Sequence, residues 1–158
     1  MPDRRTQPDS GPLSAGVQPI KEVSPTAEVP PLDQLFPFPL DDFQLEAIDA
    51  LNQGHSVVVS APTGSGKTLV GEYAIYRALA HGQKVFYTTP LKALSNQKLR
   101  DFREQFGPER VGLMTGDLTV NREASVVVMT TEVLRNMLYA GSEALEGLSY
   151  VVMDEVHF

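Results

Sequence analysis

The glycine-rich stretch at residues 61–68, Ala-Pro-Thr-Gly-Ser-Gly-Lys-Thr, most constrains what this 158-residue chain can fold into. It follows an apolar segment at 56–60 and precedes a helix-forming run that starts at Leu69. A strand that feeds a glycine-rich turn opening a helix is the geometry that grips nucleotide phosphates. Gly64 and Gly66 lack a Cβ, so their backbone can approach phosphate oxygens closely. The stretch therefore predicts a nucleotide site.

Two side chains in this stretch have specific expected roles. Lys67 can reach the β- and γ-phosphates as a point charge, and the Thr68 hydroxyl is placed to bind Mg²⁺. A plain Gly/Ser turn before a helix is the alternative, which the flanking strand and helix patterns disfavour. Ala61 stands where the standard phosphate-loop pattern begins with Gly. The expected nucleotide-binding residues of the loop are Ala61, Pro62, Thr63, Gly64, Ser65, Gly66, Lys67 and Thr68.

Composition limits the classes of protein to which the chain can belong. It has no cysteine, which excludes disulfides and zinc–cysteine sites and fits a reducing compartment. It has no apolar run near the roughly 20 residues of a membrane span, and residues 1–30 lack a signal-peptide core. We therefore expect a cytoplasmic protein with no membrane partner.

The net charge of −7 argues against a general nucleic-acid binder, which is normally basic. Residues 84–110 are an exception, with six basic and three acidic side chains. That stretch could hold nucleic acid, or it could be an ordinary solvated helix face.

Residues 1–35 contain seven of the twelve prolines and no apolar periodicity, which predicts a disordered tail. Asp41 is a plausible N-cap for a helix from Asp42 to about Asn52. Beyond it, strands are expected at 56–60, 84–88, 110–114, 125–129 and 149–153, with helices at 69–80, 92–106 and 131–139 between them. Short apolar strands alternating with helices predict an α/β fold, with a mostly parallel sheet covered by helices on both faces.

The last predicted strand ends in Asp154, Glu155, Val156 and His157. Two carboxylates at the end of a buried strand are costly unless a cation or a reaction needs them. Together with the glycine-rich loop, Asp154 is suited to hold Mg²⁺, and Glu155 to polarise an attacking water.

The loop and the Asp-Glu-Val-His sequence together resemble motifs I and II of superfamily-2 helicases of the DExH type. The sequences of the segments between them most resemble those of the superkiller-type, exosome-assisting RNA helicases. The resemblance implies that residues 36–158 form part of a first RecA-like ATP-binding domain. It also implies ATP and Mg²⁺ as cofactors, with Lys67, Asp154, Glu155 and His157 in catalysis.

The same resemblance assigns further residues. Phe43 and Gln44 match the end of the Q-motif that reads adenine. Segments 89–97, 115–117 and 130–136 match the loops that grip a single strand, which implies nucleic-acid contacts at Pro90, Lys92, Gln97, Thr115, Gly116, Asp117, Thr131 and Arg135.

The resemblance implies an ATP-dependent helicase that moves 3′ to 5′ along single-stranded RNA and unwinds duplexes, in an RNA-decay or processing complex. Superfamily-2 helicases continue past motif II into a second RecA-like domain, which also supplies arginine fingers. We therefore expect the chain to be a fragment with little ATPase activity alone. A DNA helicase of the same superfamily and a non-catalytic nucleotide-binding or interaction module are the alternatives.

Overall fold

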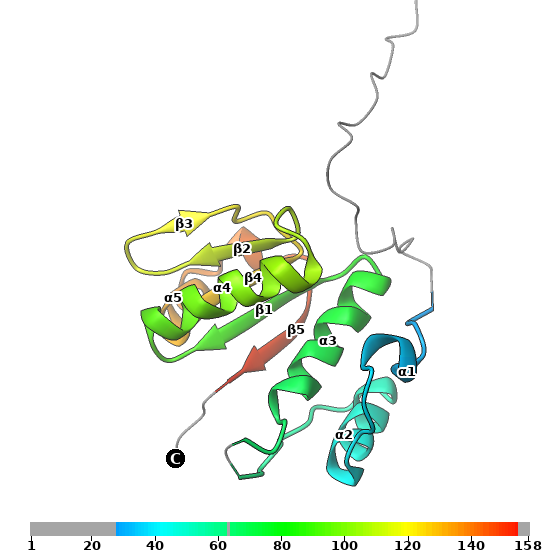
Figure 1. Ribbon diagram of the computed structural model, residues 1–158. Helices are drawn as coiled ribbons and strands as arrows, with labels where there is room; N and C mark the ends of the chain where they lie inside the picture. Colours follow the sequence, from blue (N-terminus) through cyan, green and yellow to red (C-terminus); the bar gives the residue numbers. More distant parts are fainter. Residues whose placement is uncertain (1–27, 63, 155–158) are drawn as a thin grey trace, which may run out of the picture.

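The computed structural model describes residues 28–62 and 64–154. Helices and strands alternate along most of this length (Figure 1). The helices are α1 (Leu32–Leu35), α2 (Asp42–Asn52), α3 (Thr68–Ala80), α4 (Lys92–Phe106), α5 (Thr131–Ala140) and the 3₁₀ turn η1 (Glu143–Leu145). The strands are β1 (Lys84–Thr89), β2 (Val111–Met114), β3 (Thr119–Val120), β4 (Val126–Thr130) and β5 (Leu148–Met153).

The strands form one sheet in the order β3-β2-β4-β1-β5. The pairs β2–β4, β4–β1 and β1–β5 are parallel, and the short β3 is antiparallel to β2. The mostly parallel α/β sheet predicted from the sequence is therefore confirmed.

Helices cover both faces of this sheet because neighbouring residues of each strand point to opposite sides. On β1, Val85 and Tyr87 face the core formed with α3 and α4, where Phe102 and Phe106 are buried. Phe86 faces the other core, formed with α5. In Figure 1, α3 and α4 lie in front of the sheet and α5 lies behind it.

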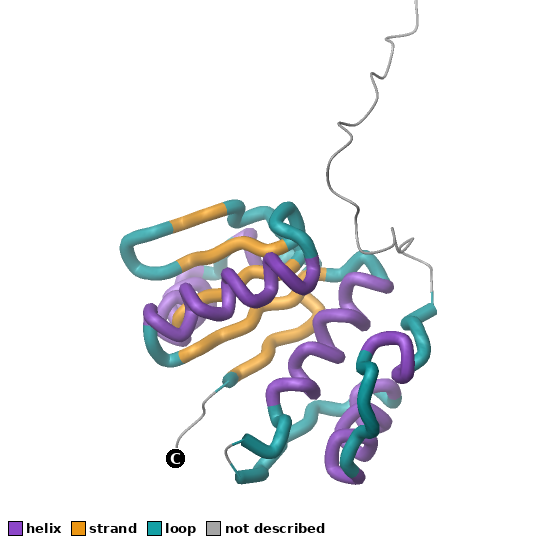
Figure 2. The backbone as a smooth tube through the Cα atoms, viewed as in Figure 1, coloured by secondary structure: helices purple, strands orange, loops and turns teal. Residues whose placement is uncertain are grey.

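The prediction of a strand at 56–60 is wrong for this structure. The described residues between α2 and α3 have no regular secondary structure, and Figure 2 draws residues 56–60 as a loop. Val58 is 88% exposed. A strand needs a neighbour to pair its backbone N–H and C=O groups, and β5 is the outermost strand on this side of the sheet. The apolar sequence alone does not supply that neighbour.

The N-terminal part of the described chain also differs from the expected tail. Helix α1 lies inside the 1–35 range, and Leu32 and Leu35 pack against a cluster that includes Phe36 and Ile48. Residues 1–27 of the expected tail lie outside the described residues. The hairpin strand β3 and the turn η1 were not anticipated.

Polar contacts join α2 and α3 to the outer strand of the sheet. Asn52 Oδ1 accepts hydrogen bonds from Tyr73 Oη at 2.6 Å and from an Arg77 guanidinium nitrogen at 2.7 Å. Arg77 Nε donates to Tyr150 Oη on β5 at 2.8 Å. This network fixes the two helices that flank the glycine-rich loop.

Candidate nucleotide and nucleic-acid site

The glycine-rich loop has the backbone geometry that its sequence predicts. Gly64 and Gly66 have φ values of +82° and +87°, a region in which side chains are strained. Ser65 N donates to the Pro62 carbonyl at 3.1 Å, which closes a turn ahead of the helix. Thr63 lies outside the described residues. The loop is thus a tight turn with two left-handed glycines, as a phosphate cradle requires.

This turn leads directly into α3. Lys67 is the N-cap residue and its side chain is exposed, while Thr68 begins the helix and is half-buried. Leu69 N and Val70 N donate to the Gly66 and Lys67 carbonyls at 3.3 and 3.2 Å. The positive end of the helix dipole faces the loop. The structure brings the loop, Lys67 and Thr68 together at one helix terminus.

Gln44 connects α2 to the loop. Its Oε1 accepts a hydrogen bond from Asp41 N at 2.8 Å, and its Nε2 donates to the Gly66 carbonyl at 3.0 Å. The side chain is 5% exposed. The predicted adenine contact stays a prediction, because in this structure the amide holds the start of α2 and the loop. The half-buried Phe43 precedes it.

An apolar groove opens just ahead of α2, and the sequence analysis did not anticipate it. The sequence gives no signal for the groove, because the exposure of Phe38 is visible only in the structure. The groove is lined by Leu32, Asp33, Phe36, Pro37, Phe38, Pro39, Leu40 and Leu45.

Asp154 follows β5 and is held by two consecutive residues of β1. Its Oδ2 accepts a hydrogen bond from Tyr87 Oη at 2.7 Å, and its backbone N donates to the Thr88 carbonyl at 2.9 Å. The predicted catalytic residues Glu155 and His157 lie outside the described residues, so their assignments stay predictions.

The packing of α3 on the sheet directs the loop toward Asp154. A Cβ on Gly71 would lie 3.1 Å from Val152 Cγ1 on β5, so the helix touches the strand there. Thr68 lies one helical turn before Gly71, and Asp154 lies two residues after Val152 on the same side of the strand. Both therefore lie toward the carboxyl edge of the sheet.

The residues at this edge fit a magnesium ion. A hydroxyl and a carboxylate are the oxygen ligands that Mg²⁺ prefers, and it usually binds through one or two protein groups plus phosphates and water. The described residues include no group of three or more His, Cys, Asp or Glu side chains suited to hold a metal. Thr68 and Asp154 would hold such an ion together with the phosphates of a bound nucleotide and water.

The predicted nucleic-acid residues lie near the same edge, because the parallel strands β1, β2 and β4 all end there. Pro90 and Lys92 follow β1 and are exposed, and Thr131 follows β4 and is exposed. Thr131 Oγ1 donates to the Thr89 carbonyl at 3.3 Å, which joins two of the loops. The remaining residues predicted as exposed contacts, Gln97, Gly116, Asp117 and Arg135, are also exposed.

Thr115 differs from the other predicted contacts, since only 8% of it is exposed. Its hydroxyl donates to Asp117 Oδ1 at 3.0 Å and shapes the turn after β2. Lys92 Nζ lies 2.9 Å from Asp117 Oδ2, an ion pair that joins this turn to the start of α4. The hydrogen bond from Lys92, and then that from Thr115, lower the pKa of Asp117 below its ordinary value.

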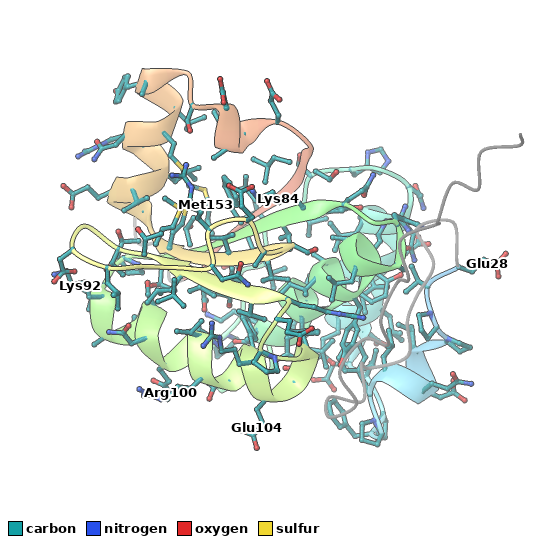
Figure 3. All side chains as sticks on the ribbon, turned by 90° about the horizontal axis from the view of Figure 1, so that it is seen from above. Glu28, Lys84, Lys92, Arg100, Glu104 and Met153 are labelled. Atoms are coloured by element: carbon teal, nitrogen blue, oxygen red, sulfur yellow. The ribbon has the colours of Figure 1, made fainter. Side chains whose placement is uncertain are left out.

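The basic stretch at 84–110 is not a continuous track. Lys84 lies at the amino end of β1, with Nζ 5.5 Å from the Phe86 ring centre. Lys98 Nζ lies over the ring of Phe102 at 5.6 Å, and Arg103 Nε donates to the Val111 carbonyl. Figure 3 shows Arg100 on the side of α4 away from the sheet. Most of these charges therefore serve the fold or the solvated helix face.

No helix within 28–62 and 64–154 has the length and apolar character needed to cross a membrane.

Comparison with known proteins places this geometry in a family. The model of the family described as "DEAD/DEAH box helicase" matches residues 41–158. "Probable helicase HelY" of Mycobacterium tuberculosis is 69% identical over 122 residues, which cover 77% of this chain and 14% of that protein. "Exosome RNA helicase MTR4" of Mus musculus is 54% identical over 123 residues, which cover 78% of this chain and 12% of that protein. "Antiviral helicase SKI2" of Saccharomyces cerevisiae is 51% identical over 123 residues, which cover 78% of this chain and 10% of that protein.

Two solved structures are also similar. The Hef helicase domain of Pyrococcus furiosus has a TM-score of 0.51 and 38% identity over 60% of this chain and 22% of its own. A "hypothetical ATP-dependent RNA helicase" from Sulfolobus tokodaii has a TM-score of 0.57 and 27% identity, and the match covers 73% of this chain and 37% of that one. The chain spans about one seventh of the length of the HelY proteins of Mycobacterium tuberculosis that it matches. It belongs to the DEAD/DEAH box helicase family, among the DExH helicases related to SKI2 and MTR4.

Proposed function

We propose that this segment is the ATP-binding part of a longer helicase that couples Mg-ATP hydrolysis to movement along single-stranded RNA. One observation carries the proposal: a glycine-rich loop opens α3 on the side of the sheet where Asp154 and the exposed loops after β1 and β4 also lie. Nucleotide chemistry and strand binding would therefore share one edge.

The roles of the residues follow from their placement. Backbone N–H groups of the loop, those of Gly66 and Lys67 among them, bind the phosphates, and Lys67 neutralises the charge that develops during phosphoryl transfer. Thr68 and Asp154 would hold the magnesium ion, which would supply charge stabilisation for phosphoryl transfer. Glu155 and His157 lie outside the described residues. Their proposed roles, orienting the water and linking this site to neighbouring motifs, rest on the resemblance to DExH helicases.

The proposal of RNA as substrate rests on relatives whose names state it, MTR4 and the DExH9 RNA helicase of Arabidopsis thaliana. MTR4 is also named for the exosome, which supports an RNA-processing complex as partner. The second RecA-like domain and its arginine fingers would come from the rest of the longer protein. We place this protein in the cytoplasm.

The decisive experiment replaces Lys67 in the longer helicase. Lys67→Ala should reduce RNA-stimulated phosphate release by at least about a hundredfold, the order expected when a group that stabilises transition-state charge is removed. Lys84→Ala is the matched control, because this lysine lies at the opposite edge of the same sheet. Near-normal turnover by Lys67→Ala would contradict the proposal.

Three further measurements test the role of Glu155, the substrate and the direction of movement. Glu155→Gln should bind ATP normally and stop turnover, so a loss of ATP binding would refute its assigned role. ATPase stimulation by RNA and DNA oligomers of matched sequence decides the substrate, and stronger stimulation by DNA would replace RNA in the proposal. Strands with a single-stranded 3′ or 5′ end test the expected 3′ to 5′ direction.

A further inference from the structure

We propose that Tyr87 is a positioning residue for the magnesium-binding carboxylate of Asp154. The inference deepens the proposed function and rests on it. It gives a core aromatic residue a part in forming the magnesium site, beside the expected ligands Thr68 and Asp154.

The contact is well defined. Tyr87 Oη donates to Asp154 Oδ2 at 2.7 Å, a short distance typical of a hydrogen bond to a carboxylate. Thr88, the next residue on β1, accepts a hydrogen bond from the Asp154 backbone N at 2.9 Å. One contact fixes the backbone of Asp154 and the other fixes its carboxylate, so the carboxylate is oriented before any ion arrives.

The ring of Tyr87 makes this orientation rigid. Tyr87 is 1% exposed, and its ring meets that of Phe102 edge-on with centres 4.9 Å apart. Lys98 Nζ lies 5.7 Å from the ring centre, and a Cβ on Gly71 would come within 3.2 Å of Tyr87 Cε2. The phenol oxygen is therefore held between the start of α3 and Asp154 by contacts on several sides.

A purely structural role is the competing explanation. Buried phenol groups generally find a hydrogen-bond partner, and Asp154 would serve that need. A phenylalanine would fill the same core space without any polar group to satisfy. The two explanations differ in what the hydroxyl does for metal binding, because a donor that orients a ligand alters metal affinity by about 10- to 100-fold.

The test is Tyr87→Phe in the longer helicase, which keeps the ring and its packing and removes the hydroxyl. A fluorescent ATP analogue is titrated at a series of Mg²⁺ concentrations and in EDTA. The Mg²⁺ concentration needed for half-maximal tightening should rise about tenfold or more. Affinity in EDTA should match that of the wild type, because the loop is untouched.

Tyr73→Phe is the matched control. Tyr73 is also buried, at 3% exposure, and its hydroxyl donates to Asn52 and not to Asp154. It should lose similar thermal stability and keep the wild-type Mg²⁺ requirement. In an Asp154→Asn background, Tyr87→Phe should add no further change in that requirement, since the two substitutions disrupt one contact.

The outcomes separate the two proposals. If Tyr87→Phe lowers Tm as Tyr73→Phe does and leaves the Mg²⁺ requirement unchanged, Tyr87 is structural only and this inference is overturned. If Lys67→Ala hydrolyses ATP normally, the proposed function itself fails. Loss of turnover in Lys67→Ala together with a raised Mg²⁺ requirement in Tyr87→Phe supports both.

Discussion

Gln44 Nε2 donates a hydrogen bond to the Gly66 carbonyl at 3.0 Å, which joins the first turn of α2 to the glycine-rich loop. The other end of the same amide accepts from Asp41 N and caps the helix. The two residues are 22 positions apart in the sequence. The position of the loop therefore depends on a helix that precedes it, as well as on its own glycines.

Gln44→Ala should weaken ATP binding by about five- to tenfold. It removes two hydrogen bonds of roughly 1 kcal/mol each, of which the one to Gly66 acts on the loop. The measurement is the Kd for ATP, with Tm as a check of folding. Gln53→Ala is the control, because the Gln53 amide donates to Asp49 on the exposed side of the same helix. Equal effects of the two variants would contradict a role for Gln44 at the loop.

Gly66→Ala should abolish measurable ATP binding, whereas Gly64→Ala should weaken it less. Both residues have positive φ, so both variants strain the backbone by about 1 kcal/mol or more. At Gly66 the new Cβ would also lie 2.6 Å from Gln44 Nε2, while at Gly64 it would meet nothing within 4 Å. Kd values for both variants decide the order. Equal losses would show that backbone strain alone governs the loop, and a larger loss at Gly64 would contradict the role given to the contact between Gly66 and Gln44.

The sequence predicts most of this architecture because its signals are local. Thr68 and Leu69 begin a helix where the loop ends, and the apolar runs that become β1 and β4 lie between clear helix signals. The failure at Val58 has a different origin. A strand exists only where another strand pairs with it, and local apolar sequence carries no information about that neighbour.

The same reasoning applies to the site. The phosphate loop and Asp154 were predictable from motif spacing alone. The contact of Tyr87 with Asp154 spans 67 positions and that of Gln44 with Gly66 spans 22, and neither leaves a periodic mark in the sequence. From the sequence, Lys98 and Arg103 could be interpreted as nucleic-acid contacts. In the structure Lys98 lies over the Phe102 ring, and Arg103 donates to the Val111 carbonyl.

Lys92→Gln should weaken single-strand binding equally for all sequences and lower the slope of log K against log salt by about 0.7. Lys92 is exposed at the carboxyl edge and pairs with Asp117 at 2.9 Å. Binding titrations across a salt series measure the slope. Lys84→Gln at the opposite edge is the control, and an unchanged slope in Lys92→Gln would remove Lys92 from the interface.

Asp117→Asn should strengthen binding several-fold at low salt, because it releases Lys92 and removes a negative charge near the phosphates. The hydrogen bonds from Lys92 and Thr115 hold the pKa of Asp117 below its ordinary value. The ion pair is therefore intact at every pH above the ordinary aspartate pKa, and it is lost only as pH falls through the lowered pKa. The effect of Asp117→Asn should therefore be constant between about pH 5 and pH 8. Weaker binding by the variant would make Asp117 a direct contact.

Glu72→Gln should raise Tm by a few degrees at neutral pH. Burial between α3 and α4 raises the pKa of Glu72, although the hydrogen bond from Gln105 and the charge of Lys98 oppose the shift. A carboxyl whose pKa is higher in the folded state favours folding below its unfolded pKa, and this contribution is lost as pH rises through the folded value. The amide removes the cost of burying a charge and can still accept the hydrogen bond from Gln105.

The difference in Tm between Glu72→Gln and the wild type should therefore vanish near pH 4 and grow toward pH 7. Glu104→Gln, on the solvent side of α4 in Figure 3, should show no such trend. A Tm difference that shrinks as pH rises would mean that ionised Glu72 stabilises the fold.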